Sequence, residues 1–311
     1  MKKIFIDGKA GTTGLRIFER LEQRDDIEII TLSEEERKLP EARKRALNSC
    51  DIAFLCLPDD AARESVGMIE NDNVIVIDTS TAHRTQSDWC YGFPELSDKF
   101  REKLLTSKRI AVPGCHASGF IALVYPLIEK GIINADELLV CHSLTGYSGG
   151  GKKMIAEYES GSDRCELLDA PRQYGITQNH KHLKEMKAIT GLENLPCFCP
   201  IVSDFYSGML VTVPIFKSQL NEGFDINSIK AVYAEKYTGE IVKYAESIDS
   251  EGFVAANALA GKDSMVVSVN GNDDRILLTA LYDNLGKGAS GAAIQCMNMV
   301  MGIDKTVGLD L

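Results

Sequence analysis

A strand, a glycine turn and a helix follow one another near the start of the chain. Residues 3–7 have the pattern of a short buried strand, Gly8, Gly11 and Gly14 follow at intervals of three, and residues 15–21 carry apolar side chains at helical spacing. Here Gly8 allows a tight turn, Gly11 lets the backbone approach a pyrophosphate, and Gly14 lets the helix pack closely on the strand. The pattern predicts a dinucleotide site at a helix N-terminus. Because the usual spacing is G-x-G-x-x-G, a turn selected only for positive φ is the alternative.

The same alternation continues to about residue 112. Its strands carry apolar residues at consecutive positions, which is typical of strands covered on both faces. We therefore expect an α/β, Rossmann-type, doubly wound parallel sheet. The further expected strands span residues 27–32, 51–58, 74–78 and 110–112, and the expected helices span residues 41–48 and 60–69.

The second part of the chain has a different pattern. Strand-like runs cluster there, and residues 271–275 form a hairpin signal between two of them. This predicts an α+β domain with a largely antiparallel sheet. The runs span residues 138–144, 209–213, 265–269 and 276–281, with helices near 182–189 and 226–237. A small-residue helix from 286 through Met301 is expected to pack back on the first domain, which gives domains of 1–116 with 285–311, and 117–284.

Charge and cysteine usage restrict the partners. The formal net charge of −11 argues against nucleic acid and anionic membranes, because no basic stripe is present to neutralise phosphates. The nine cysteines lack framework spacing and no signal peptide precedes them, which indicates a cytoplasmic protein. No apolar run approaches the roughly 20 residues that span a bilayer. Cys197 and Cys199 lack a second pair at ligand spacing, so no metal site is expected.

Cys115 lies at a corner between a strand and a helix. It follows Pro113-Gly114, and residues 117–128 have a helical pattern. A helix N-terminus favours the thiolate, and its N–H groups can hold an oxyanion on an acyl carbon bonded to the sulfur. Cys115 is therefore a candidate nucleophile. The alternative is an ordinary buried thiol.

A nucleophilic thiol needs a proton-transfer partner. His180 and His182 flank a lysine at the start of a predicted helix, and we take them as the candidate acid/base pair. The side chain of His116, adjacent to Cys115, is expected to point elsewhere. His83 and His142 are expected to be core histidines with satisfied hydrogen bonds.

The end of the second strand bears on the cofactor. Ser33, with Arg37 and Lys38 nearby, stands where an NAD-specific site has a ribose-binding carboxylate. A hydroxyl beside two cations suits a 2′-phosphate and favours NADP. Glu34 could bind the ribose instead, so NAD remains the alternative cofactor. The run 34–38 also fits a solvated charged segment.

These elements together define a reaction class. A thiolate attacks an activated acyl carbon, a leaving group departs, and a hydride from NADPH reduces the thioester to an aldehyde. An acyl phosphate is the natural small-molecule substrate. Lys152, Arg84 or Arg172 could receive its phosphate.

Five motifs occur in an order that resembles a known family. They are Gly8-x-x-Gly11-x-x-Gly14, Pro113-Gly114-Cys115, Gly146-Tyr147-Ser148-Gly149-Gly150-Gly151-Lys152, Tyr174 with His180-Lys181-His182, and residues 287–293. Over nearly the whole chain they resemble the short form of the N-acetyl-γ-glutamyl-phosphate reductases of arginine biosynthesis. The larger superfamily includes the aspartate-semialdehyde and glyceraldehyde-3-phosphate dehydrogenases.

The resemblance implies NADPH-dependent reduction of N-acetyl-L-glutamyl 5-phosphate to the semialdehyde and phosphate. It implies Cys115 as nucleophile, His182 as acid/base, His180 and Tyr174 as substrate-placing residues, Asn284 near the nicotinamide, and a homodimer or homotetramer. Domain 1–116 then binds NADP, and 117–284 carries catalysis and oligomerisation. The expected cofactor residues are Gly8, Gly11, Thr12, Thr13, Gly14, Ser33, Pro58, Ser80 and Asn284. The expected substrate residues are Tyr174, Lys152, Arg84 and Ser148.

The chain also departs from the long form of that family. His116-Ala117-Ser118 replaces Tyr-Pro-Thr, and Lys181 replaces an arginine, so the division of roles between His180 and His182 stays open. Two other functions remain as alternatives. One is aspartate-semialdehyde dehydrogenase or a related acyl-phosphate reductase, and the other is a non-catalytic dinucleotide-binding regulator.

Overall fold

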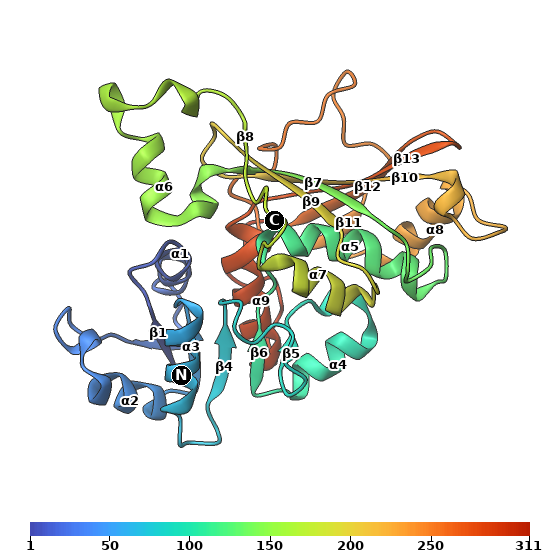
Figure 1. Cartoon of the computed structure of the whole chain (residues 1–311). Coiled ribbons are helices and arrows are strands. Elements are labelled where there is room, and N and C mark those ends of the chain that lie inside the picture. The colour runs from blue at the N-terminus through green and yellow to red at the C-terminus, as the bar shows by residue number, and fades with distance from the viewer. The chain divides into compact units, whose positions relative to one another are not determined.

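The chain forms two compact units. The computed structural model describes residues 1–311. The first unit comprises Met1–Pro113 and Ala289–Leu309, and the second comprises Gly114–Gly288 and Asp310–Leu311 (Figure 1). The predicted fold class is confirmed, since one unit has a parallel sheet and the other a mixed, mainly antiparallel sheet. No helix is both long enough and apolar enough to cross a membrane.

The first unit is built on a six-stranded sheet with the order β2-β1-β3-β4-β6-β5. Every pairing in it is parallel. Its strands are β1 (Lys2–Asp7), β2 (Ile27–Ile30), β3 (Ile52–Leu55), β4 (Ile75–Asp78), β5 (Cys90–Tyr91) and β6 (Arg109–Ala111).

Helices cover both faces of this sheet, as the apolar strands require. Ile4 and Ile6 contribute to one core with α1 (Thr12–Leu21), α4 (Asp98–Thr106) and α9 (Gly291–Val300). Phe5, between them, contributes to the core on the opposite face with α2 (Pro40–Ser49) and α3 (Asp59–Gly67). The doubly wound arrangement follows from this two-sided burial. The expected small-residue helix is a π-helical turn, Gly286–Ser290, followed by α9.

The second unit has a seven-stranded sheet with the order β11-β12-β13-β10-β7-β9-β8. Only the pairs β7–β9 and β11–β12 are parallel. The predicted hairpin joins β12 and β13, which pair in antiparallel register. The strands are β7 (Val140–Gly146), β8 (Arg172–Gln173), β9 (Cys197–Ser203), β10 (Met209–Phe216), β11 (Val242–Tyr244), β12 (Met265–Gly271) and β13 (Arg275–Tyr282).

Three helices lie on one side of this sheet, as Figure 1 shows: α5 (Cys115–Glu129), α7 (His182–Thr190) and α8 (Ile226–Lys236). The strand residues beneath them alternate, so that Met209 and Val211 of β10 are buried while Leu210 is only half-buried. The same alternation in β7 buries Cys141 and Ser143 and exposes His142. The expectation that His142 is a core histidine is therefore wrong. A fourth helix, α6 (Gly151–Tyr158), follows the glycine loop.

Candidate active site

Cys115 is the first residue of α5, two positions earlier than the sequence pattern placed the helix. Gly114 is the N-cap residue in extended conformation, and no side chain caps this end of the helix. The first turn of α5 holds no acidic residue of its own, and the carboxylate that meets this end of the helix is that of Glu185, at the N-cap residue. The sulfur belongs to a half-buried residue, and the position suits a thiolate and an oxyanion.

Two side chains hold the backbone on either side of this thiol through three hydrogen bonds. Glu185, buried on α7, accepts a bond of 2.8 Å from the N–H of Gly114. The Tyr282 hydroxyl donates to the Cys115 carbonyl at 2.5 Å and accepts from the N–H of Gly119 at 3.0 Å. Neither Glu185 nor Tyr282 was identified from the sequence. For Glu185 a signal exists, because it follows His182 by three residues and therefore shares its face of the helix.

The turn before α9 lies directly against the nucleophile. A Cβ atom on Gly288 would be 3.1 Å from the Cβ of Cys115. Any side chain at position 288 would therefore crowd Cys115, and this close contact of the two backbones explains the glycine.

Three imidazoles gather beside α5. The ring centroids of His180 and His182 are 4.8 Å apart, and the ring of His116 lies 5.9 Å and 5.6 Å from them. Nδ1 of His180 accepts the N–H of His182 at 3.3 Å, so only its Nε2 is available for other partners. Burial, aided by the charge of Lys181, lowers the pKa of His180, which keeps this ring neutral near pH 7.

His116 does not point away from the site. Its buried ring hydrogen-bonds the Ser143 hydroxyl through Nδ1 at 2.7 Å and the Tyr174 hydroxyl through Nε2 at 2.6 Å. The expectation was wrong because α7 packs along α5, so the side chain that follows Cys115 meets the His180 and His182 rings. Burial lowers the pKa of His116 to about 3, with a smaller effect of His180.

The expected substrate residues occupy different places. Tyr174 is half-buried and belongs to the imidazole cluster through His116. Lys152 is exposed in the first turn of α6. Arg84 is buried in the first unit, where it donates to the carbonyls of Val112 and Thr79. Arg172 donates from β8 to the hydroxyl of Tyr158.

Asn284 and Ser148 are hydrogen-bonded to each other. Nδ2 of the buried Asn284 donates to the Ser148 hydroxyl at 3.0 Å, and its Oδ1 accepts the N–H of Gly208 at 2.9 Å. The adjacent Asp283 is also buried and accepts from Ser207 and from three backbone N–H groups, those of Gly261, Leu285 and Gly286. Asp283 thereby fixes the turn that carries Asn284. Asn284 belongs to the same unit as Cys115.

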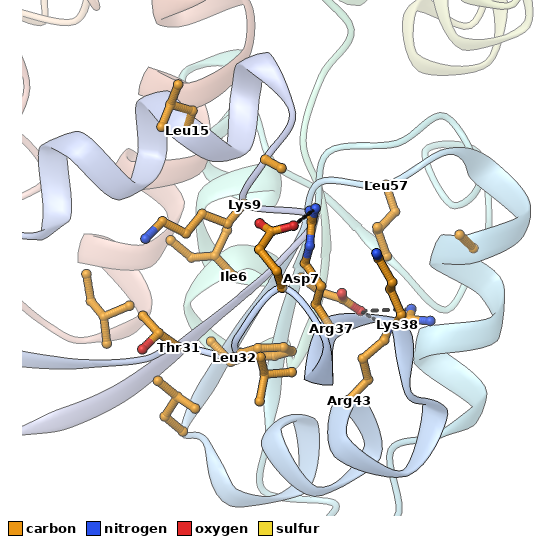
Figure 2. A pocket seen from close by; sticks show the side chains of 17 residues that line it. Ile6, Asp7, Lys9, Leu15, Thr31, Leu32, Arg37, Lys38, Arg43 and Leu57 are labelled. Carbon is orange, nitrogen blue, oxygen red and sulfur yellow. Dashed lines mark hydrogen bonds and ion pairs between the residues drawn. The ribbon is translucent and has the colours of Figure 1, made fainter.

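A pocket of about 440 Å³ lies beside the glycine turn of the first unit. Gly8 lines it, and so do the cationic side chains of Arg37, Lys38 and Arg43, which Figure 2 shows around Asp7. Arg43 donates to Asp7 at 3.0 Å, and Arg37 pairs with Glu34. The cations at 37 and 38 were expected, whereas Arg43 lies in a helix that has no local motif.

The three glycines of the turn differ in what requires them. A Cβ on Gly8 would be 2.3 Å from the Cys56 carbonyl oxygen, and φ there is +87°. A Cβ on Gly14 would be 2.5 Å from the oxygen of Gly8. At Gly11 the nearest atom would be 3.4 Å away, an ordinary contact. The fold therefore leaves at Gly11 a space that a side chain would fill, and this fits a phosphate held at the start of α1.

The other cofactor residues expected in the first unit do not line this pocket. Thr12 and Thr13 open α1, and Pro58 is the N-cap residue of α3. Ser80 is buried and donates to Asp78 at 2.7 Å. The hydroxyl of Ser33 accepts the N–H of Glu36 at 3.2 Å, at the start of the short turn 36–38 that carries the two cations.

His83 is a core histidine, as expected. It is buried, bonds Asp78 at 2.6 Å and stacks on Trp89 with ring centroids 4.0 Å apart. Cys197 and Cys199 are free thiols on β9. No group of three or more histidine, cysteine or acidic side chains is arranged to hold a metal ion.

Comparison with known proteins gives the class to which this fold and site belong. Residues 3–104 match the NAD-binding domain of semialdehyde dehydrogenases, and residues 115–284 match their dimerisation domain. Among solved structures, aspartate-semialdehyde dehydrogenase II from Vibrio cholerae superposes with a TM-score of 0.71 at 15% identity over 97% of this chain and 98% of that one. The enzyme from Candida albicans, solved with NADP, gives 0.68 at 16% identity over 99% of both chains. The chain is thus built as a two-domain semialdehyde dehydrogenase.

Curated relatives narrow the class. The N-acetyl-γ-glutamyl-phosphate reductase 2 of Nostoc sp. is 43% identical over 99% of both chains. The N-acetyl-γ-glutamyl-phosphate reductase of Brucella ovis is 45% identical over 96% of this chain and 99% of that one. The chain belongs to the N-acetyl-γ-glutamyl-phosphate reductase family.

Proposed function

We propose that this protein reduces N-acetyl-L-glutamyl 5-phosphate to N-acetyl-L-glutamate 5-semialdehyde and phosphate, with NADPH as reductant, in arginine biosynthesis. One observation supports this most strongly. Glu185 and His182 share a face of α7, and Glu185 holds Gly114, the residue before Cys115. A single helix therefore positions both the candidate base and the candidate nucleophile.

In the proposed reaction the Cys115 thiolate attacks the acyl carbon and the acyl–phosphate bond breaks. The N–H groups at the start of α5 stabilise the oxyanion of that step. The dinucleotide supplies the hydride that reduces the thioester. His182 then protonates the oxygen as the thiohemiacetal forms. It takes that proton back as the thiohemiacetal collapses, which releases the aldehyde and regenerates the thiolate. His180, Tyr174, Ser148, Lys152 and Arg84 remain the proposed substrate contacts.

The proposed cofactor is NADP. The cationic wall of Arg37, Lys38 and Arg43 suits the extra phosphate of NADP. Gly8, Gly11, Thr12, Thr13 and Gly14 would hold the pyrophosphate, with Ser33, Pro58, Ser80 and Asn284 as the other proposed contacts.

We further propose that the first unit binds the dinucleotide and that the second carries catalysis and assembly. The match to a dimerisation domain supports oligomerisation. A homodimer or homotetramer in the cytoplasm is the proposed working form, and sedimentation analysis measures the subunit number.

The test is turnover with Cys115→Ser. We expect the wild-type protein to oxidise NADPH with N-acetylglutamyl phosphate, and the variant to lose at least about 10³-fold in kcat while it still binds NADPH. Cys165→Ser, which alters an exposed cysteine, should behave as wild type. Turnover with aspartyl phosphate alone would identify an aspartate-semialdehyde dehydrogenase. NADPH binding without turnover of any acyl phosphate would indicate a regulator.

A further inference from the structure

Three side chains from separate elements form a hydrogen-bonded chain beside Cys115. Ser143 comes from β7, His116 from α5, and Tyr174 from the segment that follows β8. The two bonds, 2.7 Å to Ser143 and 2.6 Å to Tyr174, use both nitrogens of the His116 ring. Ser143 and His116 are buried, so water does not compete for these groups. Neither His116 nor Ser143 has a role in the reaction proposed above.

The surroundings of His116 keep its ring neutral. The rings of His180, His182, Tyr174 and Phe198 pack around it, with the Phe198 centroid 5.3 Å away. None of these four groups offers a negative charge near pH 7, and burial lowers the pKa of His116 even though Cys115, the proposed thiolate, is its neighbour in the chain. A neutral imidazole has one donor nitrogen and one acceptor nitrogen, so the chain has a direction.

Tyr174 stays protonated as well. Burial raises the pKa of the Tyr174 phenol, and the charge of a Cys115 thiolate raises it further. The hydroxyl therefore has one proton to donate, either to Nε2 of His116 or to a ligand in the site.

We infer that His116 is a positioning residue that acts through Tyr174. Ser143 donates to Nδ1, Nε2–H of His116 donates to the Tyr174 oxygen, and the Tyr174 proton is thereby left for an oxygen of the anionic substrate. The opposite direction would present only lone pairs of Tyr174 to that oxygen, which is unfavourable for an anion. The substrate class and the direction of the chain rest on the proposed function, whereas the two hydrogen bonds of His116 do not.

A set of variants tests the dependence on Tyr174. His116→Phe keeps a ring in the cluster and removes both hydrogen bonds, and His116→Gln keeps a donor that can reach Tyr174. We expect His116→Phe and Tyr174→Phe each to raise KM for the acyl phosphate about tenfold, the effect of one hydrogen bond, with a smaller change in kcat. The double variant should be no worse than Tyr174→Phe alone, and His116→Gln should recover part of the loss.

Phe198→Leu is the matched control, because it disturbs the packing of the same rings without removing a hydrogen bond. It should leave KM within about threefold of wild type. Additive losses in the double variant, or a loss in Phe198→Leu equal to that in His116→Phe, would overturn the inference.

A second measurement does not depend on turnover. Nitrogen-15 NMR of the histidine side chains distinguishes the two neutral tautomers, and the signal missing from His116→Phe identifies His116. We expect a neutral ring protonated on Nε2 from pH 8 to pH 5. Protonation on Nδ1, or an imidazolium in that range, would overturn the inference. If the wild-type protein fails to reduce the acyl phosphate, the proposed function fails while this measurement still decides the direction of the chain.

Discussion

Oε1 of Glu185 accepts a hydrogen bond of 2.8 Å from the backbone N–H of Gly114, the residue that precedes Cys115. The carboxylate is buried, and it stands one helical turn after His182 on α7. The bond therefore joins the helix of the candidate base to the loop of the candidate nucleophile. It also satisfies a backbone donor that water does not reach.

Removal of the acceptor at Glu185 should destabilise this loop. In Glu185→Ala the buried N–H of Gly114 loses its partner, so we expect the free energy of unfolding to fall by about 2 kcal/mol and kcat to fall at least tenfold. Glu185→Gln retains an acceptor oxygen and should lose less of both. Lys184→Gln, an exposed change on the same helix, is the control. Urea unfolding and initial rates measure the effects, and equal losses in the Ala and Gln variants would show that the charge matters and not the acceptor.

The order of elements and the position of Cys115 could be predicted because they depend on local signals. The apolar strands, the glycine turn and the hairpin at 271–275 all arise from neighbours in the sequence. The contacts that complete the site join distant residues, such as Glu185 to Gly114 and His116 to Tyr174. The spacing of Glu185 from His182 indicates a shared helix face but not the partner, because both contacts depend on how α7 and the segment after β8 meet α5. His142 shows the same limit, since strand alternation gives two faces but does not say which one is buried.

The glycine turn offers a test that separates folding from cofactor binding. Gly11→Ala should fold normally, because its Cβ would make only an ordinary contact at 3.4 Å. We expect its unfolding free energy to change by less than about 1 kcal/mol while the Kd for NADPH rises at least tenfold, since the methyl group fills the space proposed for the pyrophosphate. Fluorescence titration with NADPH measures the Kd.

Gly14→Ala is the matched variant for that test. Its Cβ would lie 2.5 Å from the Gly8 oxygen, so the backbone must shift, and we expect a loss of about 2 kcal/mol in unfolding free energy. NADPH binding by Gly11→Ala that equals the wild type would contradict the proposed position of the pyrophosphate.

The charged wall of the pocket predicts cofactor preference. Arg37→Ala with Lys38→Ala removes two cations from the lining. We expect the Kd for NADPH to rise about tenfold to a hundredfold, because each contact to a phosphate is a charge-assisted hydrogen bond, while the Kd for NADH changes about twofold. Arg45→Ala removes an exposed cation of α2 that does not line the pocket, and it should change neither. Equal losses for both dinucleotides would argue against recognition of a 2′-phosphate.

The buried imidazole of His116 makes stability depend on pH. Its pKa in the folded protein is about 3, against an ordinary value of 6.5. Below pH 6.5 the unfolded chain therefore binds a proton that the folded chain does not, so the free energy of unfolding falls as pH falls. Above pH 6.5 this residue does not lower the free energy of unfolding, and from pH 6.5 toward pH 3 it lowers that free energy progressively. Between pH 6 and pH 5 the loss due to this one residue should be about 1 kcal/mol.

His116→Phe isolates that contribution, because every other titrating group is common to both proteins. Urea unfolding at pH 7, 6 and 5 should show that stability falls more steeply in wild type than in the variant, by about 1 kcal/mol over the last interval. The burial that also lowers the pKa of His180 acts in both proteins and cancels in the difference. Parallel profiles would mean that His116 has an ordinary histidine pKa in the folded protein. The neutral hydrogen-bonded chain from Ser143 to Tyr174 would then not exist in acid.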